Sequence, residues 1–458
     1  MNNRHRLTWN EIQQYQKDQP NTMLELIERF GPVAELNMMG VNLTFVADPD
    51  MIQKLLIKHA QHLHRDPFTF RVFRRMVGDG VFIAEGETWR KKRKLIQPIF
   101  HAAHIHDFAD AFAKQAKDMV QSWQVGDSIQ IEEEMMGLAL RIICETMFGT
   151  KIDALVPKIS QLMREIMQQA EAQLRPPVPD WFPTLGMWQQ RKSVKQLRAL
   201  LLDIIHQRQN DIAQGKTIEP DLLTMLLTAV DEDGNPLSDV EVLDECLTIF
   251  VAGHETTAVA MSWTWMLLLQ HPDILDRLKR DIEHNLGDAP ISFERLAEIP
   301  YLAQVVKESL RLYPPAHGFG RTPTESFTID GHQFNKGDIV IISTYALHRQ
   351  ERFYSNPLVF DPDRFAPDRE QPPRYAFIPF GAGSRTCIGN AFAMLEMQVI
   401  LATMLQQVEL SLEPNQEFEP VMEVTLRPEN GVRVQVEKQK EPSAQKMENA
   451  LNLMTNIE

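Results

Sequence analysis

The spacing of apolar residues along the chain predicts a mainly helical protein. Between Pro49 and Leu269 the apolar residues mostly follow the three- and four-residue spacing of helices with one buried face. Alternation typical of strands is short and peripheral. It occurs within Gly31–Asp48, best at Val41–Val46, and again at Thr328–Phe334 and Asp338–Thr344. We therefore expect a mainly α fold with small peripheral β-sheets.

The longest predicted helix begins at a capping box, in which Ser238 and Glu241 satisfy the first backbone N–H groups. Its apolar pattern continues to Gln270, and His271–Pro272 ends it. At ~1.5 Å per residue this helix would be roughly 50 Å long, enough to cross the molecule. Apolar residues surround most of its axis, so we expect it to be buried. The acidic residues inside it argue against a membrane span.

Three shorter elements are predicted in the second half of the chain. One helix spans Tyr301 to Leu312, and another spans Asn390 to Leu405. A hairpin-like stretch follows from Phe418 to Val436. The residues after it are polar, and we expect 437–458 to form a tail without chemistry.

Composition narrows the class of protein. The 458 residues carry 62 acidic and 47 basic side chains, a formal net charge of -15 that argues against general nucleic-acid affinity. No Gly/Ser-rich linker or internal repeat divides the chain, so we expect a single domain over 1–458. The first twenty residues hold no apolar run, so we expect neither a signal peptide nor a membrane anchor. Three widely spaced cysteines suit a reducing compartment, and we expect a soluble, cytoplasmic protein.

The most informative stretch is a glycine-rich loop around Cys387. Glycines let the backbone wrap tightly around a sulfur atom. The N–H groups of such a loop and of the helix behind it favour negative charge, so a thiolate here could ligate a metal. An inert, buried cysteine in a turn is the alternative, and it is the expectation for Cys144 and Cys246. The loop has the pattern F-G-x-G-x-R-x-C-x-G, with Phe380, Gly381, Gly383, Arg385, Cys387 and Gly389 at its fixed positions.

A second conspicuous stretch lies in the middle of the long predicted helix, from Ala252 to Thr257. Glycine and a pair of threonines are unfavourable inside a helix, and such local conflicts often mark function. Gly253 would let another group approach the helix closely. Threonine can bond back to a carbonyl one turn earlier and bend the helix. A kink whose hydroxyl is satisfied in this way is the alternative to a functional role.

Both stretches resemble the cytochrome P450 family. The loop matches the family's haem-binding pattern at every fixed position, and the helix stretch matches its oxygen-binding groove, [A/G]-G-x-[D/E]-T-[T/S]. The resemblance implies the cytochrome P450 fold, with haem b as cofactor and Cys387 as the axial ligand of its iron. It gives Thr256 a hydrogen bond to dioxygen and Glu255 a part in proton delivery. It also implies cofactor contacts from Phe380, Gly381, Gly389, Ala252 and Gly253.

A third match is Glu308-Ser309-Leu310-Arg311. Glu and Arg at i and i+3 share a helix face, but such a pair alone is usually solvated. Further along, Phe360–Phe365 completes the family's F-x-P-x-R-F pattern. The resemblance therefore implies a buried structural triad of Glu308, Arg311 and Arg364 that supports the haem loop.

The stretch Trp89–Lys94 fits the family's W-x-x-x-R helix. The resemblance implies that Trp89 and Arg93 reach the haem propionates, which an arginine fork can bind bidentately. Arg321 and Arg385 hold the family's other propionate-binding positions. The rest of the basic run 90–94 is expected to point outward. It is either a solvated face or a docking site for an acidic electron carrier.

Bulky apolar residues from several parts of the chain predict an apolar pocket and hence a lipophilic substrate. Ordinary core packing is the alternative for each residue of this predicted pocket. His317 could be a polar handle on the substrate, and a water-satisfied loop histidine is the alternative. The predicted pocket residues are Phe68, Phe73, Phe82, Ile249, Phe250, Ala316, His317, Phe319 and Val424.

The resemblance implies a monooxygenase that inserts one oxygen atom of dioxygen into an unactivated C–H or C=C bond. No reductase domain is recognisable, so we expect a separate ferredoxin or flavodoxin and its reductase to supply electrons. A peroxide-driven peroxygenase or a hydroperoxide isomerase is the alternative, although such relatives usually lose the acid–alcohol pair kept here as Glu255 and Thr256. A haem sensor or carrier without turnover is a third hypothesis.

Overall fold

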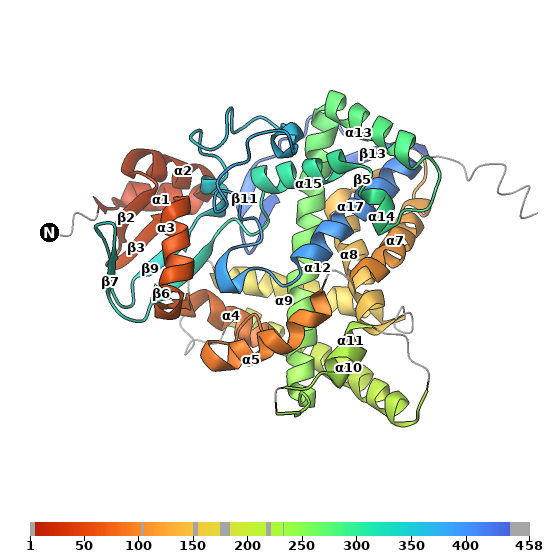
Figure 1. The fold of residues 1–458 in the computed structure, drawn as a ribbon, viewed down its shortest axis with the longest axis horizontal. Coiled ribbons are helices and arrows are strands. Elements are labelled where there is room, and N and C mark those ends of the chain that lie inside the picture. Colours follow the sequence, from red (N-terminus) through yellow and green to blue (C-terminus); the bar gives the residue numbers. More distant parts are fainter. Residues whose placement is uncertain are drawn as a thin grey trace, which may run out of the picture.

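A computed structural model describes residues 5–101, 105–149, 154–174, 184–216, 221–231 and 233–439. A large helical region lies on one side of the molecule and a mixed sheet with its covering helices lies on the other (Figure 1). The helices are α1 (Trp9–Lys17), α2 (Gln19–Phe30), α3 (Pro49–Gln53), α4 (Pro67–Val77), α5 (Gly86–Ile96), α7 (Ala109–Gln121), α8 (Ile131–Phe148), α9 (Val156–Leu174), α10 (Leu185–Ala213), α11 (Leu222–Thr228), α12 (Asp239–Gln270), α13 (Pro272–Asn285), α14 (Phe293–Leu296), α15 (Pro300–Leu312), α16 (Thr344–Leu347) and α17 (Asn390–Gln407).

The strands form one larger sheet and three small ones. The six-stranded sheet has the order β1-β2-β3-β9-β6-β4, and the others are β10-β13-β5, β11-β12 and β7-β8. The strands are β1 (His5–Arg6), β2 (Val33–Met38), β3 (Val41–Val46), β4 (Leu63–Arg65), β5 (Ser128–Gln130), β6 (Phe319–Pro323), β7 (Phe327–Ile329), β8 (His332–Phe334), β9 (Ile339–Ile342), β10 (Val408–Leu412), β11 (Pro420–Met422), β12 (Leu426–Pro428) and β13 (Arg433–Gln439).

Helix α12 runs through the middle of the helical region (Figure 1). It has 32 residues and begins at the predicted capping box of Ser238 and Glu241. Most of its side chains are buried, as the apolar residues around its axis predict. At Gly253 the helix lies so close to α8 that a Cβ atom would come within 2.9 Å of Ile143 Cδ1. Glycine therefore permits this close packing of the two helices.

Two hydrophobic cores hold the molecule together, one among the helices and one between the six-stranded sheet and the helices that cover it. The loop that carries Cys387 lies where these cores meet. Ile378 and Ala382 belong to the core of the sheet, whereas Phe380 and Ile388 pack against the helical core. The loop is therefore fixed from both sides.

The expected mainly α fold with small peripheral sheets is confirmed. Cys144 and Cys246 are buried in the helical core, as predicted. Two expectations at the end of the chain are wrong. The stretch from Phe418 to Val436 is not one hairpin, because β11 pairs with β12 whereas β13 pairs with β10 and β5. The tail does not begin at Glu437, because pairing with β10 extends β13 to Gln439. Residues 440–458 lie outside the described residues.

Candidate active site

The Cys387 loop is a tight turn between the end of the sheet region and α17. Gly381 and Gly383 both have positive φ, at 72° and 75°, and only glycine adopts this conformation easily. A Cβ atom on Gly383 would also lie 2.8 Å from the carbonyl oxygen of Leu56, in the π-helical turn Lys54–Lys58. The N–H of Cys387 donates to the Phe380 carbonyl at 2.9 Å. These backbone contacts hold the loop in one conformation and therefore fix the direction of the Cys387 side chain.

The Cys387 side chain has exposed surface although protein surrounds it. Burial raises the pKa of its thiol, whereas the N–H of Gly389 and the positive charge of Arg93 lower it. A side chain that is both crowded by protein and exposed faces an internal space rather than bulk solvent. Because a thiolate rather than a thiol binds metals, the nearby N–H donor and Arg93 suit this sulfur to ligation.

Helix α12 has a short exposed patch in the middle of its otherwise buried length. Ala252 is exposed and Gly253 and Thr256 are half-buried, whereas His254 and Glu255 between them are buried. The Thr256 hydroxyl donates to the Ala252 carbonyl at 2.7 Å, which is the backward bond that the sequence indicated. The stretch therefore presents one small, open face, and Thr256 lies on it.

Glu255 points away from that face. Its Oε1 accepts a hydrogen bond of 2.8 Å from the Thr425 hydroxyl, and both side chains are buried. Burial raises the pKa of Glu255, and the bond from Thr425 and the charge of Arg427 lower it. Glu255 and Thr256 are adjacent in sequence, yet Glu255 bonds to Thr425 whereas Thr256 bonds to the Ala252 carbonyl of its own helix.

A cavity of about 330 Å³ gathers several of the predicted anion-binding residues. Its walls include Trp89, Arg321 and Arg385, and also Arg65, which the sequence did not identify. The Arg385 guanidinium lies 4.0 Å from the centre of the Trp89 ring. Arg385 also pairs with Glu85 at 2.5 Å, and Arg65 lies 3.8 Å from the same carboxylate.

These arginines carry more positive charge than the nearby protein neutralises. Burial, and then repulsion from Arg385 and Arg321, lowers the pKa of Arg65 to about 9. Burial and Arg385 lower the pKa of Arg321 to about 10. The Nη1 atom of Arg65 is buried and has no hydrogen-bond partner among the described residues.

The arrangement fits a group with two carboxylates that is held beside a thiolate. Arg65 and Arg385 both pair with the single Glu85 carboxylate, and Arg321 adds a third positive charge to the same cavity wall. The orphaned donor on Arg65 requires a further acceptor. Haem b has two propionates and an iron atom that a thiolate can ligate, so the residues present fit this cofactor. Arg93 lies on the Cys387 side, where it interacts with the thiol and donates to Gln97 at 3.3 Å.

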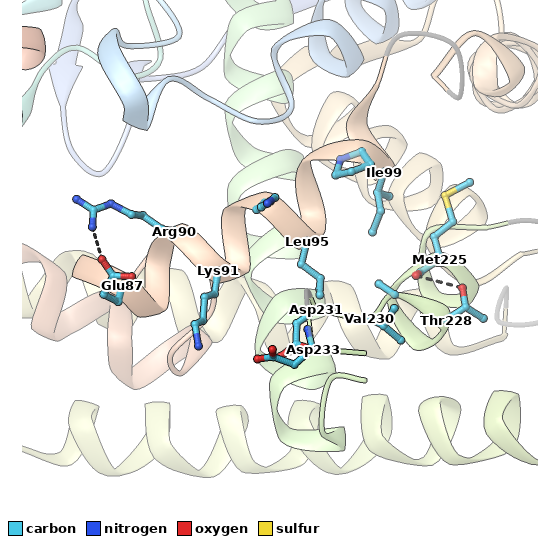
Figure 2. Close-up of a pocket in the computed structure, with 13 residues that line it drawn as sticks. Glu87, Arg90, Lys91, Leu95, Ile99, Met225, Thr228, Val230, Asp231 and Asp233 are labelled. Carbon is cyan, nitrogen blue, oxygen red and sulfur yellow. Dashed lines mark hydrogen bonds and ion pairs between the residues drawn. The ribbon is translucent and has the colours of Figure 1, made fainter. Parts of the chain in front are cut away.

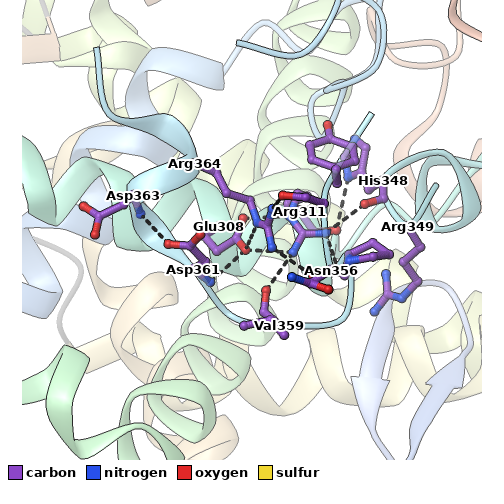
Figure 3. Close-up of polar contacts among 12 residues, drawn as sticks. Glu308, Arg311, His348, Arg349, Asn356, Val359, Asp361, Asp363 and Arg364 are labelled. Carbon is purple, nitrogen blue, oxygen red and sulfur yellow. Dashed lines mark hydrogen bonds and ion pairs between the residues drawn. The ribbon is translucent and has the colours of Figure 1, made fainter. Parts of the chain in front are cut away.

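The structure brings Glu308, Arg311 and Arg364 together, as Figure 3 shows. Arg311 donates twice to Glu308, at 2.7 Å each, and both residues are fully buried. Arg364 donates to the same carboxylate at 3.2 Å, and the Asp361 N–H does so at 3.0 Å. The carboxylate therefore organises the irregular chain before the cysteine loop.

His348, which the sequence analysis missed, lies beside Arg311 (Figure 3) and connects this triad to the cysteine loop through Ile378. Its Nδ1 donates to the Arg311 carbonyl at 3.2 Å, and its Nε2 accepts from the Ile378 N–H at 2.9 Å. Burial and the charges of Arg311 and Arg349 lower the pKa of His348 to about 3, so the ring is neutral and keeps both roles. No short motif around His348 signals this link.

Helix α5 carries the basic run, and one part of the prediction for it is wrong. Lys92 does not point outward: it is buried and lies 3.3 Å from the buried Glu245 of α12. Arg90, Lys91 and Lys94 are exposed, as expected. They line a groove of about 710 Å³, shown in Figure 2, whose opposite wall includes Asp231 and Asp233.

The predicted pocket residues divide into two groups. Ala316 is exposed, and Ile249, Phe82, Phe319 and Val424 are half-buried, so each has surface available to a ligand. Phe250 is instead a core residue, because it has no exposed surface and its ring lies 5.5 Å from that of Phe148. Phe73 is buried against Phe82, with the ring centres 5.5 Å apart. The side chain of Phe68 lies outside the described residues.

His317 is tied to the hairpin rather than left to water. Its Nε2 donates to the Glu423 carbonyl at 3.1 Å. Burial lowers the pKa of the ring, so it is neutral. The Nδ1 atom is then the acceptor that this side chain could offer to a substrate.

None of the helices among the described residues is both long enough and apolar enough to span a membrane. A family profile described as "Cytochrome P450" matches residues 2–436. The chain is 31% identical to "Cytochrome P450 4V2" of Rattus norvegicus over 408 residues, which cover 82% of this chain and 76% of that protein. It is 30% identical to "Cyclooctat-9-en-7-ol 5-monooxygenase" of Streptomyces melanosporofaciens, with 85% of each chain covered. The solved structure "Retinoic acid bound cyanobacterial CYP120A1" superposes with a TM-score of 0.82 at 27% identity, over 91% of this chain and 93% of that one.

Proposed function

Because the chain belongs to the cytochrome P450 family, we propose that it is a haem-thiolate monooxygenase that acts on a lipophilic substrate and takes electrons from a separate carrier. The family makes it an oxidoreductase that binds haem b. The observation that carries the finer proposal is the excess of buried arginines beside an exposed, protein-enclosed cysteine.

Cys387 would hold the cofactor on one side, and the arginine cluster would hold its two carboxylates. When bound, haem b supplies an iron atom that activates dioxygen, and a thiolate ligand favours cleavage of the O–O bond. Burial raises the pKa of the Cys387 thiol, and the Gly389 N–H and Arg93 oppose this by favouring the thiolate that would bind the iron. Arg65, Arg321 and Arg385 would each gain a charge-assisted hydrogen bond, which stabilises the loaded protein.

Thr256 and Glu255 would control protons on the opposite side. The open face of α12 at Ala252 and Gly253 leaves room for a small ligand, and the Thr256 hydroxyl borders that room. Glu255 has a raised pKa, so it keeps a proton more readily than an exposed glutamate and can donate it. The aromatic cluster of Phe70, Phe73 and Phe82 would exclude water from the substrate.

The electron carrier would dock on the exposed part of α5. Arg90, Lys91 and Lys94 form a positive edge on a protein whose net charge is -15. An acidic ferredoxin or flavodoxin would be steered to this edge, and its association would slow as salt is added. Lys91→Glu together with Lys94→Glu should weaken this salt dependence, whereas Lys438→Glu on β13 serves as the control. Equal effects of the two changes would contradict docking on α5.

The proposal is tested with the full chain loaded with haem. Cys387→Ala should abolish the thiolate-type spectrum of the reduced carbon-monoxide complex, whereas Cys144→Ala, which removes a buried thiol elsewhere, should keep it. Retention of the spectrum in Cys387→Ala would exclude Cys387 as the ligand. Product that forms with peroxide, and never with an electron donor plus dioxygen, would instead establish the peroxygenase alternative.

The substrate class is tested by optical titration with lipophilic molecules. Retinoic acid, fatty acids and steroids form a suitable panel, because they combine a large apolar body with few polar groups. His317→Ala should weaken binding of ligands that carry a hydrogen-bond donor more than binding of pure hydrocarbons. Equal weakening of both kinds would exclude His317 as a polar contact.

A further inference from the structure

A charged cluster lies behind Glu255, on the side away from Thr256. Arg427 of β12 bonds to the Glu132 carboxylate of α8 and lies 3.2 Å from Glu423 and 3.8 Å from Glu171 of α9. Glu132 is buried, with 7% of its side chain exposed, whereas 28% of Arg427 and 23% of Glu423 is exposed. The cluster therefore reaches from the interior to solvent.

Thr425 joins this cluster to Glu255. Thr425 lies in the turn between Glu423 and Arg427, and its carbonyl accepts a hydrogen bond of 3.0 Å from the Glu423 N–H. The Thr425 hydroxyl donates to Glu255, which directs the carboxylate toward this turn. The charge of Arg427 lowers the pKa of Glu255, and the charges of Glu132 and Glu423 raise it.

One cation and two carboxylates act on the charge of Glu255. Arg427 lowers the pKa of Glu255, while Glu132 and Glu423 raise it and burial raises it most. Because Arg427 is already bonded to carboxylates, its charge is not available to hold Glu255 permanently ionised. Burial similarly raises the pKa of Glu132, the innermost carboxylate of the cluster. A carboxyl group whose pKa is raised keeps its proton to higher pH than an exposed one, so it can pass a proton on.

We propose that Thr425 is a positioning residue for Glu255, and that the cluster of Arg427, Glu132 and Glu423 is the route by which Glu255 takes up protons from solvent. The inference rests on the proposed function of Glu255 as a proton donor. In each cycle the Glu255 carboxylate gains one proton on the side of the cluster and gives it up on the side of Thr256, so all of these residues end unchanged. The Glu255 side chain, which is bonded to Thr425, must rotate to carry the proton from one side to the other.

The positioning part is tested on the resting, haem-loaded protein. The infrared carboxyl band of Glu255, identified by its loss in Glu255→Gln, is titrated with pH. Thr425→Val should move this titration upward, because it removes a bond that lowers the pKa of Glu255. Thr403→Val is the matched control, since that buried threonine bonds only to the Val399 carbonyl of its own helix, among the contacts described. An unchanged titration in Thr425→Val would overturn the positioning role.

The route is tested by turnover. Thr425→Val and Arg427→Met should each lower product formation about tenfold, less than the ~10²–10⁴-fold that a general acid supplies, and should enlarge the solvent isotope effect. Arg427→Lys keeps a cation if the methionine variant does not fold, and it should partly restore both values. A shifted titration without any change in product or isotope effect would overturn the route. Wild-type protein that forms no product with dioxygen and electrons would refute the proposed function instead, and the infrared titration would still decide the role of Thr425.

Discussion

Replacing Glu308 by glutamine should destabilise the protein strongly, because this carboxylate neutralises a fully buried arginine. Glu308 accepts two bonds from Arg311, one from Arg364 and one from the Asp361 N–H. The amide has nearly the same volume, but it brings no charge and turns an NH₂ group toward a guanidinium. Arg311 would keep its bonds to carbonyls such as that of Pro357, yet its charge would remain buried and unpaired.

Breaking a buried ion pair in this way costs ~3–5 kcal/mol. Unfolding entropy is roughly 2.1 cal/mol/K per residue, and for 458 residues this gives about 1 kcal/mol/K. Glu308→Gln should therefore lower the melting temperature of the haem-loaded protein by about 3–5 °C. The His348 link to Ile378 predicts that haem is released in the same transition, because the triad and the cysteine loop are joined.

The matched control is Asp363→Asn, which makes the same chemical change in a more exposed pair. Asp363 and Arg277 are 37% and 44% exposed and 2.8 Å apart, and such surface pairs contribute ~0–1 kcal/mol. Calorimetry at one scan rate, with haem absorbance followed in parallel, compares the two variants. Equal melting temperatures, or melting of Glu308→Gln with haem retained, would refute the idea that the triad supports the loop.

Three further predictions concern single side chains. Thr256→Ala should uncouple electron use from product and release peroxide, measured as product per electron pair; unchanged coupling would show that ordered water or substrate replaces the hydroxyl. Arg65→Met should weaken haem binding by ~1.5–3 kcal/mol, the usual contribution of a charged hydrogen bond; haem transfer to an acceptor protein measures this, exposed Arg433→Met is the control, and equal transfer rates would exclude Arg65 from the site. Burial raises the pKa of Glu396 to about 8 from an ordinary 4.5, although Thr257 donates to it. Between these two values the folded protein holds the extra proton, so its stability should fall as pH rises, by at most about 1.4 kcal/mol per unit. Glu396→Gln should flatten this dependence of the melting temperature, and an unchanged slope would assign the loss to other groups.

The elements that the sequence predicted well are those encoded within a short segment. The capping box at Ser238, the apolar length of α12 and the glycines around Cys387 depend on neighbours a few residues away. The Glu308–Arg311 pair also lies within one helical turn, and a short motif placed Arg364 beside it. Such local patterns carry both the fold class and the positions of the main candidate residues.

The features that the sequence did not reveal depend on partners far along the chain. Lys92 belongs to a basic run, but it is buried because Glu245, 153 residues away, meets it on α12. Arg65 joins the arginine cluster only because β4 pairs with β6. Local alternation likewise could not show that β13 leaves the last hairpin for β10. The cytoplasmic location, the single-domain assignment and the roles of the site residues remain predictions.

The cysteine loop is clamped by both hydrophobic cores, since Ile378 and Ala382 are anchored in one and Phe380 and Ile388 in the other. A small displacement of the sheet region relative to the helices would therefore move the Cys387 sulfur, even if no residue in contact with that sulfur were substituted. Substitutions far from the loop, in the helical core or in the core of the sheet, should then cause small changes in the absorption spectrum of the thiolate-bound cofactor. One optical signal would report how well the two halves of the molecule fit together.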